Sequence, residues 1–422
     1  MEAINKINSR LKNKDSLLAA GIIFLIGAAA SAIFNYLYHL FMGRMLGPLE
    51  YGILGSLFAL IYIATFSTSA FNLSISKFSA ELTGKQNLGA FKYLIRKSLA
   101  YTSFAGAVIL VLYLISIPFI ANFMNVEDYI GFVLVGLIGY LTLISAVLTG
   151  ALNGTQKFIW QNSSSVASNF FKFAFAVILV YLGFGVNGAL IAILIGLIIC
   201  IGLALYPFIS SLKNVRAEHF NSGKIPTYLL FAFFASVIPI LLITLDQVLV
   251  KHYFSSTDAG YYVAAGMIAK VIWFGSGFLV GPLFPKVASL YSQGKDTSKI
   301  LIKALIYTIL LVIVGCAAYY IMPIFIVSML YGSEYIEAVP PLIGLFGVGI
   351  AMFSINQIMI TYNLAIERKS FIWIFILAIL AEVAGIFLFH NTLEEVIKIF
   401  FAVNCFTLVA MLFYNRKEIF NL

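Results

Sequence analysis

The chain has 422 residues, of which 62% are hydrophobic and only 10% are charged. Soluble proteins average about 45–50% apolar and about 25% charged residues, so this chain lacks the polar side chains that a water-exposed surface needs. The composition excludes a soluble globular protein and predicts an integral membrane protein. The net charge of +9 is interpreted below through the position of the charges, and nucleic-acid binding is not favoured.

Apolar runs long enough to cross a bilayer recur along the whole chain. A transmembrane helix needs about 20 apolar residues, and these runs are continuous, whereas transmembrane β-strands alternate apolar and polar residues. We therefore predict an all-α integral membrane protein with twelve transmembrane helices. The predicted spans are 17–41, 53–74, 99–121, 130–152, 161–183, 186–209, 228–250, 260–284, 300–322, 339–364, 370–389 and 396–414.

The basic residues predict the orientation of these helices. With the N-terminus in the cytoplasm, most of the 26 Lys and Arg residues fall in cytoplasmic segments, and acidic residues dominate the outer segments. This distribution follows the positive-inside rule. We expect a multi-pass protein of the plasma membrane with both termini in the cytoplasm, where only Arg44, Lys251 and Lys398 are basic residues of the outer segments.

Short motifs recur in the same order in the two halves of the chain, which indicates an internal duplication. Because each half holds an even number of spans, the two copies have the same orientation, as in some transporters. We predict two six-helix lobes, 1–210 and 228–422, around a central cavity and joined by a cytoplasmic linker at 211–227. The matching motifs are Glu50-Tyr51-Gly52 with Asp258-Ala259-Gly260-Tyr261, and Lys157-Phe158-Ile159-Trp160 with Lys369-Ser370-Phe371-Ile372-Trp373.

Four ionisable residues lie inside predicted spans and are the strongest candidates for a functional site. Each charge at the bilayer centre costs about 2.5–3.5 kcal/mol, so these side chains should face the protein interior. Lys172 and Lys270, with Arg44 at the outer end of the first span, are expected to make the cavity cationic and to bind an anionic headgroup. Asp246 and Glu382 are expected to couple ion movement to transport.

A purely structural interpretation of these residues stays open, in which Lys172 pairs with Glu382 or Lys270 pairs with Asp246. The tyrosines near the outer ends of the spans are interpreted as an aromatic belt at the membrane surface. They include Tyr36, Tyr38, Tyr51, Tyr261, Tyr262, Tyr319, Tyr320 and Tyr331.

Motifs for enzymatic chemistry are absent from the sequence. No P-loop, zinc-protease or nucleophile-elbow motif occurs, and the three cysteines are far apart in apolar runs. We expect no catalytic residues, no cofactor and no metal site.

Several segments resemble a known family of membrane proteins. Gly43–Gly52 is similar to the turn after the first helix of polysaccharide (oligosaccharide) flippases in the multidrug/oligosaccharidyl-lipid/polysaccharide exporter superfamily. Ser76–Glu81, Gly150–Phe158, and Asp246 followed by Gly260–Ala265 are also similar. The resemblance implies twelve helices in two lobes, a cationic cavity, and movement of polyprenyl-diphosphate-linked sugars from the cytoplasmic to the outer leaflet.

The sequence thus predicts an alternating-access flippase for a lipid-linked oligosaccharide in a bacterial or archaeal plasma membrane. Its partners are the substrate, membrane lipids and a coupling cation, H⁺ or Na⁺. An ion-coupled exporter of drugs or organic cations is the alternative, and it requires a net anionic cavity. A membrane-embedded glycosyltransferase, polymerase or ligase is a third hypothesis, for which the outer acid pairs Glu334/Glu337 and Glu394/Glu395 are the only candidates.

Overall fold

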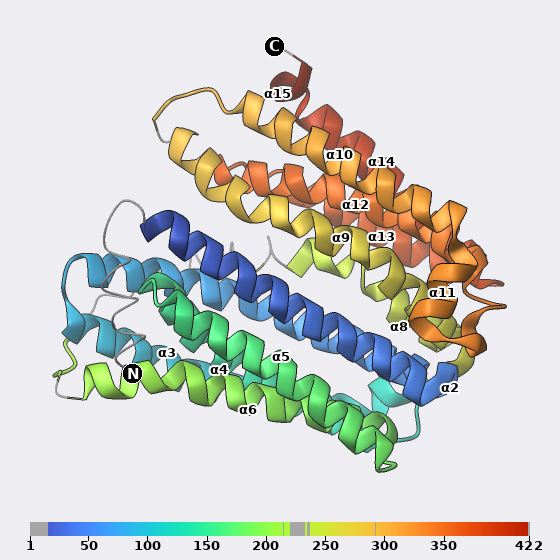
Figure 1. Cartoon of the computed structure of the whole chain (residues 1–422), viewed down its shortest axis with the longest axis horizontal. Helices are drawn as coiled ribbons and strands as arrows, with labels where there is room; N and C mark the ends of the chain where they lie inside the picture. The colour runs from blue at the N-terminus through green and yellow to red at the C-terminus, as the bar shows by residue number, and fades with distance from the viewer. Residues whose placement is uncertain (1–15, 214, 220–232, 234–236, 292, 421–422) are drawn as a thin grey trace. The chain divides into compact units, whose positions relative to one another are not determined.

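The computed structural model describes residues 16–213, 215–219, 233, 237–291 and 293–420. These residues are predominantly α-helical and contain no strand, which confirms the predicted all-α class (Figure 1). Eight of the described helices are long and apolar enough to cross a membrane. The helices are α2 (Ser16–Gly84), α3 (Leu88–Phe123), α4 (Tyr129–Gly154), α5 (Phe158–Tyr181), α6 (Gly185–Leu212), α8 (Leu245–Tyr253), α9 (Ser256–Tyr291), α10 (Ser298–Ile321), α11 (Pro323–Tyr331), the 3₁₀ turn η1 (Ser333–Tyr335), α12 (Pro340–Ala365), α13 (Ile372–Leu388), α14 (Leu393–Tyr414) and α15 (Arg416–Phe420).

The predicted spans coincide with these helices, apart from the seventh. Of span 228–250, residues 228–232 and 234–236 lie outside the described residues, whereas 237–241 are helical, 242–244 form a turn and the rest belongs to α8. Helix α2 carries the first two spans and is broken at Gly47, whose φ of 69° is accessible mainly to glycine. Pro48 follows and suits the first position of a new helix because it has no N–H to satisfy. The sequence Gly47-Pro48 therefore divides α2 into a segment before residue 47 and a segment after it.

Four turns in corresponding places of the two halves are closed in the same way. They follow α2, α4, α9 and α12, and each has one residue with positive φ: Gln86, Gln156, Gly294 and Glu367. In each turn this residue's N–H donates to the carbonyl three positions back, and the next N–H donates to the carbonyl five positions back. This is the Schellman pattern of helix termination. Its recurrence after the second and fourth predicted span of each half supports the internal duplication.

The described chain divides into two compact units. Unit 1 comprises Met1–Met45, Ala64–Asn122 and Glu127–Ser236, and unit 2 comprises Leu46–Ile63, Phe123–Val126 and Val237–Leu422. The second segment of α2 is therefore shared, since its first part packs in unit 2 and the rest in unit 1. The predicted linker, 211–227, runs into residues outside the described part of the chain, so its boundaries remain a prediction.

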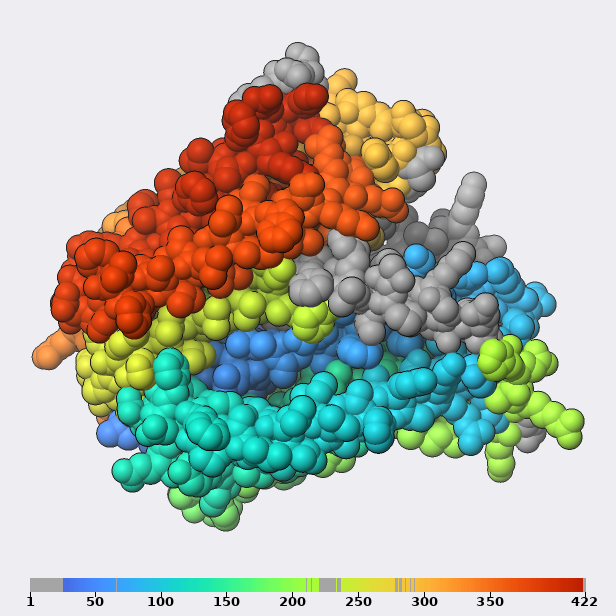
Figure 2. All heavy atoms as spheres, turned by 180° about the vertical axis from the view of Figure 1, so that it is seen from behind, coloured from blue at the N-terminus to red at the C-terminus, as the bar shows by residue number. Residues whose placement is uncertain are grey.

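Unit 1 is built by close helix packing through small residues. Helix α6 packs on α4 and α5. Gly150 and Gly154 bring α4 against α2, because a Cβ at these positions would lie 2.6 Å from the carbonyl oxygen of Asn72 and 2.3 Å from that of Ser76. Such a small-residue spacing lets membrane helices approach closely. Helix α3, which is in full view in Figure 2, carries large exposed apolar side chains, as expected of a lipid-facing helix.

Unit 2 is organised around α12. This helix is buried along most of its length and packs against α9, α10 and α14. Its Phe346 contacts the rings of Tyr262 on α9 and Phe400 on α14. Helix α13 packs on α14 and on α8. This arrangement brings α8, α9 and α13, which carry Asp246, Lys270 and Glu382, into one unit.

Candidate functional site

The five predicted site residues are divided between the two units. Lys172 lies on α5 in unit 1, and Arg44 lies exposed near the end of the first segment of α2. Lys270, Asp246 and Glu382 all lie in unit 2, on α9, α8 and α13. Three of the five predicted residues therefore lie in the same unit. The proposed Lys172–Glu382 pair joins residues of different units.

Lys172 is a buried ammonium whose hydrogen-bond partner is neutral. Its side chain is 8% exposed, and its Nζ donates to Oδ1 of Asn35 at 2.5 Å. The same Nζ lies 4.8 Å from the centre of the Tyr38 ring, and the Tyr38 hydroxyl donates to the Ala189 carbonyl at 3.0 Å. No ion pair involves Lys172 among the described residues. An ammonium held by an amide and a ring keeps its attraction for an anion.

A stripe of polar side chains continues this contact between α2 and α5. Asn169, one turn before Lys172, donates to the hydroxyl of Ser31 at 2.7 Å, one turn before Asn35. Nearer the start of α2, Gly27 faces Asn162, whose side chain would lie 2.5 Å from a Cβ at Gly27. Polar groups between membrane helices must satisfy one another because lipid offers no hydrogen bonds. The stripe therefore fixes the register of α5 against the first segment of α2.

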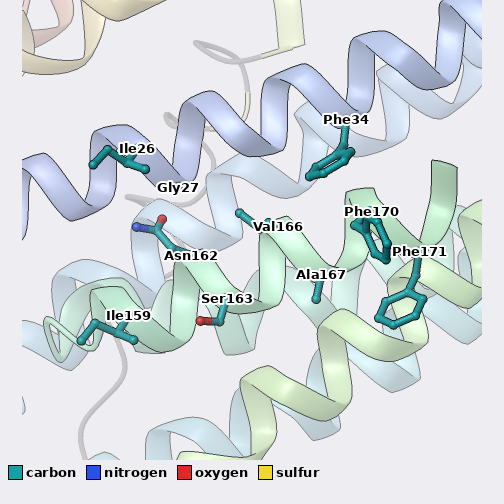
Figure 3. Close-up of a pocket in the computed structure, with 10 residues that line it drawn as sticks. All are labelled: Ile26, Gly27, Phe34, Ile159, Asn162, Ser163, Val166, Ala167, Phe170 and Phe171. Atoms are coloured by element: carbon teal, nitrogen blue, oxygen red, sulfur yellow. The ribbon is translucent and has the colours of Figure 1, made fainter. Parts of the chain in front are cut away.

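A groove lies beside this stripe in unit 1. It has a volume of about 590 Å³ and is formed by the first segment of α2 and by α5 (Figure 3). Apart from Asn162 and Ser163, its walls are apolar or glycine: Ile26, Gly27, Phe34, Ile159, Val166, Ala167, Phe170 and Phe171. Such a lining suits a hydrocarbon chain rather than a hydrated solute. Phe171 adjoins Lys172 in sequence, so the groove extends along the helix that carries the ammonium.

Asp246 is the anchored member of the charged cluster in unit 2. Its side chain is fully buried in the first turn of α8, where the helix dipole favours a negative charge. One carboxylate oxygen accepts a hydrogen bond from the Tyr262 hydroxyl at 2.7 Å, and the other accepts from the backbone N–H of Gln247 at 2.9 Å. These donors stabilise the ionised carboxylate.

Lys270 on α9 and Glu382 on α13 are the other buried ionisable residues of the predicted site in this unit. Lys270 is 2% exposed and Glu382 is 0% exposed. The Lys270 Nζ and both carboxyl oxygens of Glu382 have no hydrogen-bond partner among the described residues. No ion pair within 4.0 Å involves Asp246, Lys270 or Glu382 in the described part of the chain. The Lys270 Nζ lies 5.7 Å from the centre of the Tyr62 ring, in the same unit.

Unit 2 therefore buries one base and two acids of the predicted site. If all three were ionised, the cluster would carry a net charge of −1, and a buried unpaired charge is strongly unfavourable. One additional positive charge neutralises it. No group of three or more His, Cys, Asp or Glu side chains that could hold a metal ion occurs within the described residues.

The sequence pattern located the charges but missed their partners. Tyr38 and Tyr262, predicted as members of an aromatic belt, are fully buried and contact Lys172 and Asp246. The prediction was wrong for these two and for Tyr51, Tyr319 and Tyr331, which are also buried, because a tyrosine near a span end can turn its hydroxyl inward to a buried partner as well as outward. The hydroxyls of Tyr51 and Tyr331 lie 3.2 Å apart. Asn35 could have been found as a polar residue inside an apolar run.

These features define the class of the protein: an all-α, multi-pass membrane protein with buried charges in membrane-spanning helices. Its fold is shared by solved transporters. An inward-facing multidrug resistance MATE family transporter of the MOP superfamily aligns with a TM-score of 0.75 and 14% identity, covering 94% of this chain and 97% of that one. The lipid II flippase MurJ in an inward closed conformation aligns with a TM-score of 0.74 and 16% identity, covering 94% and 87%. The eukaryotic MATE transporter AtDTX14 aligns with a TM-score of 0.67 and 13% identity, covering 97% and 96%.

The chain belongs to the polysaccharide biosynthesis protein family, whose model matches residues 17–291. This match confirms the resemblance found in the sequence, and the shared fold agrees with the predicted twelve-helix, two-lobe architecture. Comparison with curated protein sequences gives no match.

Proposed function

We propose that the protein is a secondary transporter that flips a polyprenyl-diphosphate-linked oligosaccharide from the cytoplasmic to the outer leaflet of a bacterial or archaeal plasma membrane. Alternating access of two lobes moves the cargo, both termini face the cytoplasm, and no chemical bond is made or broken. The family match and the fold shared with a lipid flippase support this proposal. They also favour it over a membrane-embedded glycosyltransferase.

The observation that carries the proposal is the buried ammonium of Lys172, which forms no ion pair with any acid in the described part of the chain. Inserting a charged side chain at the bilayer centre costs about 2.5–3.5 kcal/mol, so a charge at this depth indicates a functional role. Its neutral partner Asn35 can be replaced by a diphosphate oxygen, which accepts a stronger, charge-assisted hydrogen bond. We assign Lys172 to the diphosphate. We retain Arg44, which is exposed near the end of the first segment of α2, as a second anion contact.

The groove along α5 supports a cargo with a hydrocarbon tail. Its apolar walls and its volume of about 590 Å³ suit a segment of a prenyl chain, while Lys172 lies next in sequence to one of its lining residues. A cargo with an anionic head and an apolar tail matches this combination better than a compact organic cation does.

Asp246 and Glu382 are assigned to ion coupling. Lys270 lies in the same unit as these acids, and we propose that it belongs to the coupling site rather than to the substrate site. The coupling ion is a cation, H⁺ or Na⁺, that offsets the excess negative charge of the cluster.

An ion-coupled exporter of drugs or organic cations is the second candidate. One observation favours it: the cluster in unit 2 has two acids for one lysine and is not cationic. Similarity of fold to MATE transporters fits either function.

The experiment is export of surface glycan in cells that depend on this protein as their flippase. Lys172→Met should lower surface glycan at least about tenfold, because the diphosphate loses its buried partner. Lys85→Met is the matched control, since Lys85 is exposed and pairs only with Glu81 one turn away. Unchanged glycan in Lys172→Met, at equal abundance in the membrane, contradicts the proposal, and accompanying efflux of organic cations favours the second candidate.

A further inference from the structure

We infer that Tyr38 is a positioning residue of the anion site: its ring holds the Lys172 ammonium at one place in the contact between α2 and α5, and its hydroxyl ties that ring to α6. The inference rests on the proposed function, in which Lys172 binds the diphosphate of the cargo. It deepens that function by naming the side chain that fixes the ammonium, and Tyr38 acts through Lys172 rather than on the cargo.

The first step is how Tyr38 itself is fixed. Its side chain is fully buried, and its hydroxyl donates to the carbonyl of Ala189 on α6 at 3.0 Å. A tyrosine buried in this way satisfies its hydroxyl while the rest of the ring packs as an apolar group. The ring is therefore held from α2 at its base and from α6 at its tip, and it presents a fixed face to α5.

The second step is the contact of this ring with the ammonium. The Lys172 Nζ lies 4.8 Å from the centre of the Tyr38 ring. A cation within about 6 Å of a ring centre is attracted by the negative face of the ring, most strongly where both are desolvated. Lys172 is buried and forms no ion pair within the described residues, so the ring and Oδ1 of Asn35 are the partners found there for its charge.

Helix α6 restricts the path of the lysine side chain. A Cβ at Gly196 would lie 3.1 Å from the Lys172 Cβ and 2.6 Å from the Ser168 carbonyl oxygen, so α6 touches α5 at the base of the lysine. Because α6 occupies this side, the lysine extends toward α2, where its Nζ meets Asn35 and the Tyr38 ring. Three helices of unit 1 thus position the ammonium.

Two aromatic pairs fix the spacing of α2 and α5 around this contact. The rings of Phe34 and Phe170, which Figure 3 shows on the facing helices, lie 5.3 Å apart, and those of Phe41 and Phe173 lie 5.1 Å apart. Both pairs meet edge to face, which is a favoured geometry for aromatic side chains. The distance between the Tyr38 ring and the lysine backbone is therefore set by packing on both sides.

The arrangement leaves donor capacity for an anion. An ammonium has three N–H groups, and within the described residues Lys172 donates one hydrogen bond, to Asn35. The face of an aromatic ring attracts a cation without neutralising its charge, so it does not replace a diphosphate oxygen as an acceptor. A lysine held by a ring rather than by a carboxylate is both fixed in place and able to bind an anionic headgroup.

The same kind of contact recurs in unit 2. The Lys270 Nζ lies 5.7 Å from the centre of the Tyr62 ring, and it makes no hydrogen bond in the described part of the chain. Tyr62 lies on α2, as Tyr38 does. Helix α2 therefore supplies an aromatic partner to each of the two buried lysines of the predicted site, which supports the ring as a means of holding a buried ammonium.

The first test is NMR of the purified full-length protein labelled with ¹³C at the Cε of lysine. The Lys172 signal is the one that is absent from Lys172→Met, and the ring current of Tyr38 should shift its Hε protons upfield. Tyr38→Leu should abolish this shift, and Tyr38→Phe should keep it because the ring remains. An unshifted Lys172 signal in wild type overturns the inference, and this outcome requires no Tyr38 variant to fold.

The second test is binding of farnesyl diphosphate, a short and water-soluble prenyl diphosphate, to the same proteins by calorimetric titration. Tyr38→Leu should raise the Kd at least about fivefold, and Tyr38→Phe should stay within about twofold of wild type. Tyr319→Leu is the matched control, since it removes a buried tyrosine of α10 whose hydroxyl also donates to a carbonyl, that of Ile268, and it should leave the Kd unchanged. Equal affinity of wild type and a folded Tyr38→Leu protein overturns the inference.

The two tests separate failure of the inference from failure of the proposed function. If wild type does not bind farnesyl diphosphate, or if Lys172→Met binds it as tightly as wild type, the proposed diphosphate site is contradicted and the anion site with it. A missing ring-current shift in a protein whose binding depends on Lys172 contradicts the role of Tyr38 alone.

Discussion

Two lysines of the same chain, Lys172 in unit 1 and Lys270 in unit 2, are buried to a similar extent in membrane-spanning helices and yet lie in opposite electrostatic surroundings. Lys172 donates to a neutral amide and faces an aromatic ring, and it forms no ion pair among the described residues. Lys270 makes no hydrogen bond among the described residues, and it shares its unit with the buried acids Asp246 and Glu382. We propose that the first lysine attracts an anionic cargo and that the second belongs to the site of the coupling cation. The partner, rather than the burial of the lysine, determines the role.

The largest expected loss of stability comes from removing the acid that we assign as the partner of Lys270. Asp246→Leu removes the charge that compensates the Lys270 ammonium and leaves it buried and unpaired, so the free energy of unfolding should fall by about 3–5 kcal/mol. Unfolding in mixed detergent micelles measures it. In Asp246→Leu/Lys270→Met most of the loss should be recovered, because no charge is left behind. A double variant as unstable as Asp246→Leu alone would falsify the electrostatic coupling of the two residues.

The corresponding change beside Lys172 should be smaller. Asn35→Leu removes one hydrogen bond to an ammonium, and the expected loss in the free energy of unfolding is about 1.5–3 kcal/mol. The same unfolding assay tests it, with Lys172→Met/Asn35→Leu as the control in which the buried donor is also gone. If Asn35→Leu costs more than Asp246→Leu, the contrast between the two lysines is reversed and the assignment of their roles fails.

Filling the groove tests whether unit 1 accommodates a hydrocarbon tail. Ala167→Trp places a large ring among the lining residues of the groove on α5 and should lower glycan export about tenfold with little change in stability, because the groove walls can hold the ring. Ile198→Trp is the matched control, since Ile198 is 58% exposed on α6 of the same unit. Equal export by both variants excludes the groove from the transport path.

The smallest effect on stability is expected for Glu382→Gln. A glutamine has the shape of the protonated glutamic acid that the structure favours, so the free energy of unfolding at neutral pH should change by less than about 1 kcal/mol. Glu382→Gln should nevertheless abolish the response of transport to a pH gradient, since it cannot release a proton. A large loss of stability at neutral pH would show that Glu382 is ionised in the folded protein.

The architecture could be predicted from the sequence because lipid imposes simple rules. Continuous apolar runs give α3 to α6, α10, α12 and α14, and the Gly47-Pro48 pair marks where α2 changes direction. The short elements α11 and η1 were missed, since nine residues from Pro323 to Tyr331 are too few to be recognised as a span. The division of α2 between the two units could not be predicted from its sequence, because the division depends on which other helices each part of α2 contacts.

The candidate site was predicted as a set of charges but not as two separate environments. Insertion cost identifies Lys172, Lys270, Asp246 and Glu382 from the sequence, because any charge in an apolar run is conspicuous. Their pairing depends on how α5, α8, α9 and α13 are placed in three dimensions, and the sequence alone left a Lys172–Glu382 pair or a Lys270–Asp246 pair open. Asn35 and Tyr262 are uncharged, so the search for charges inside spans did not identify them as partners. Their contacts with Lys172 and Asp246 are seen only in the packed structure.

The most direct test of the proposed function is flipping by the purified protein in proteoliposomes. A fluorescent oligosaccharide linked to a polyprenyl diphosphate is placed in both leaflets, and the fraction accessible from outside is followed with an impermeant quencher. The account predicts that a pH gradient or a Na⁺ gradient shifts this fraction in wild type and that Lys172→Met abolishes the shift. No redistribution under either gradient, in vesicles that do transport an organic cation, would contradict it.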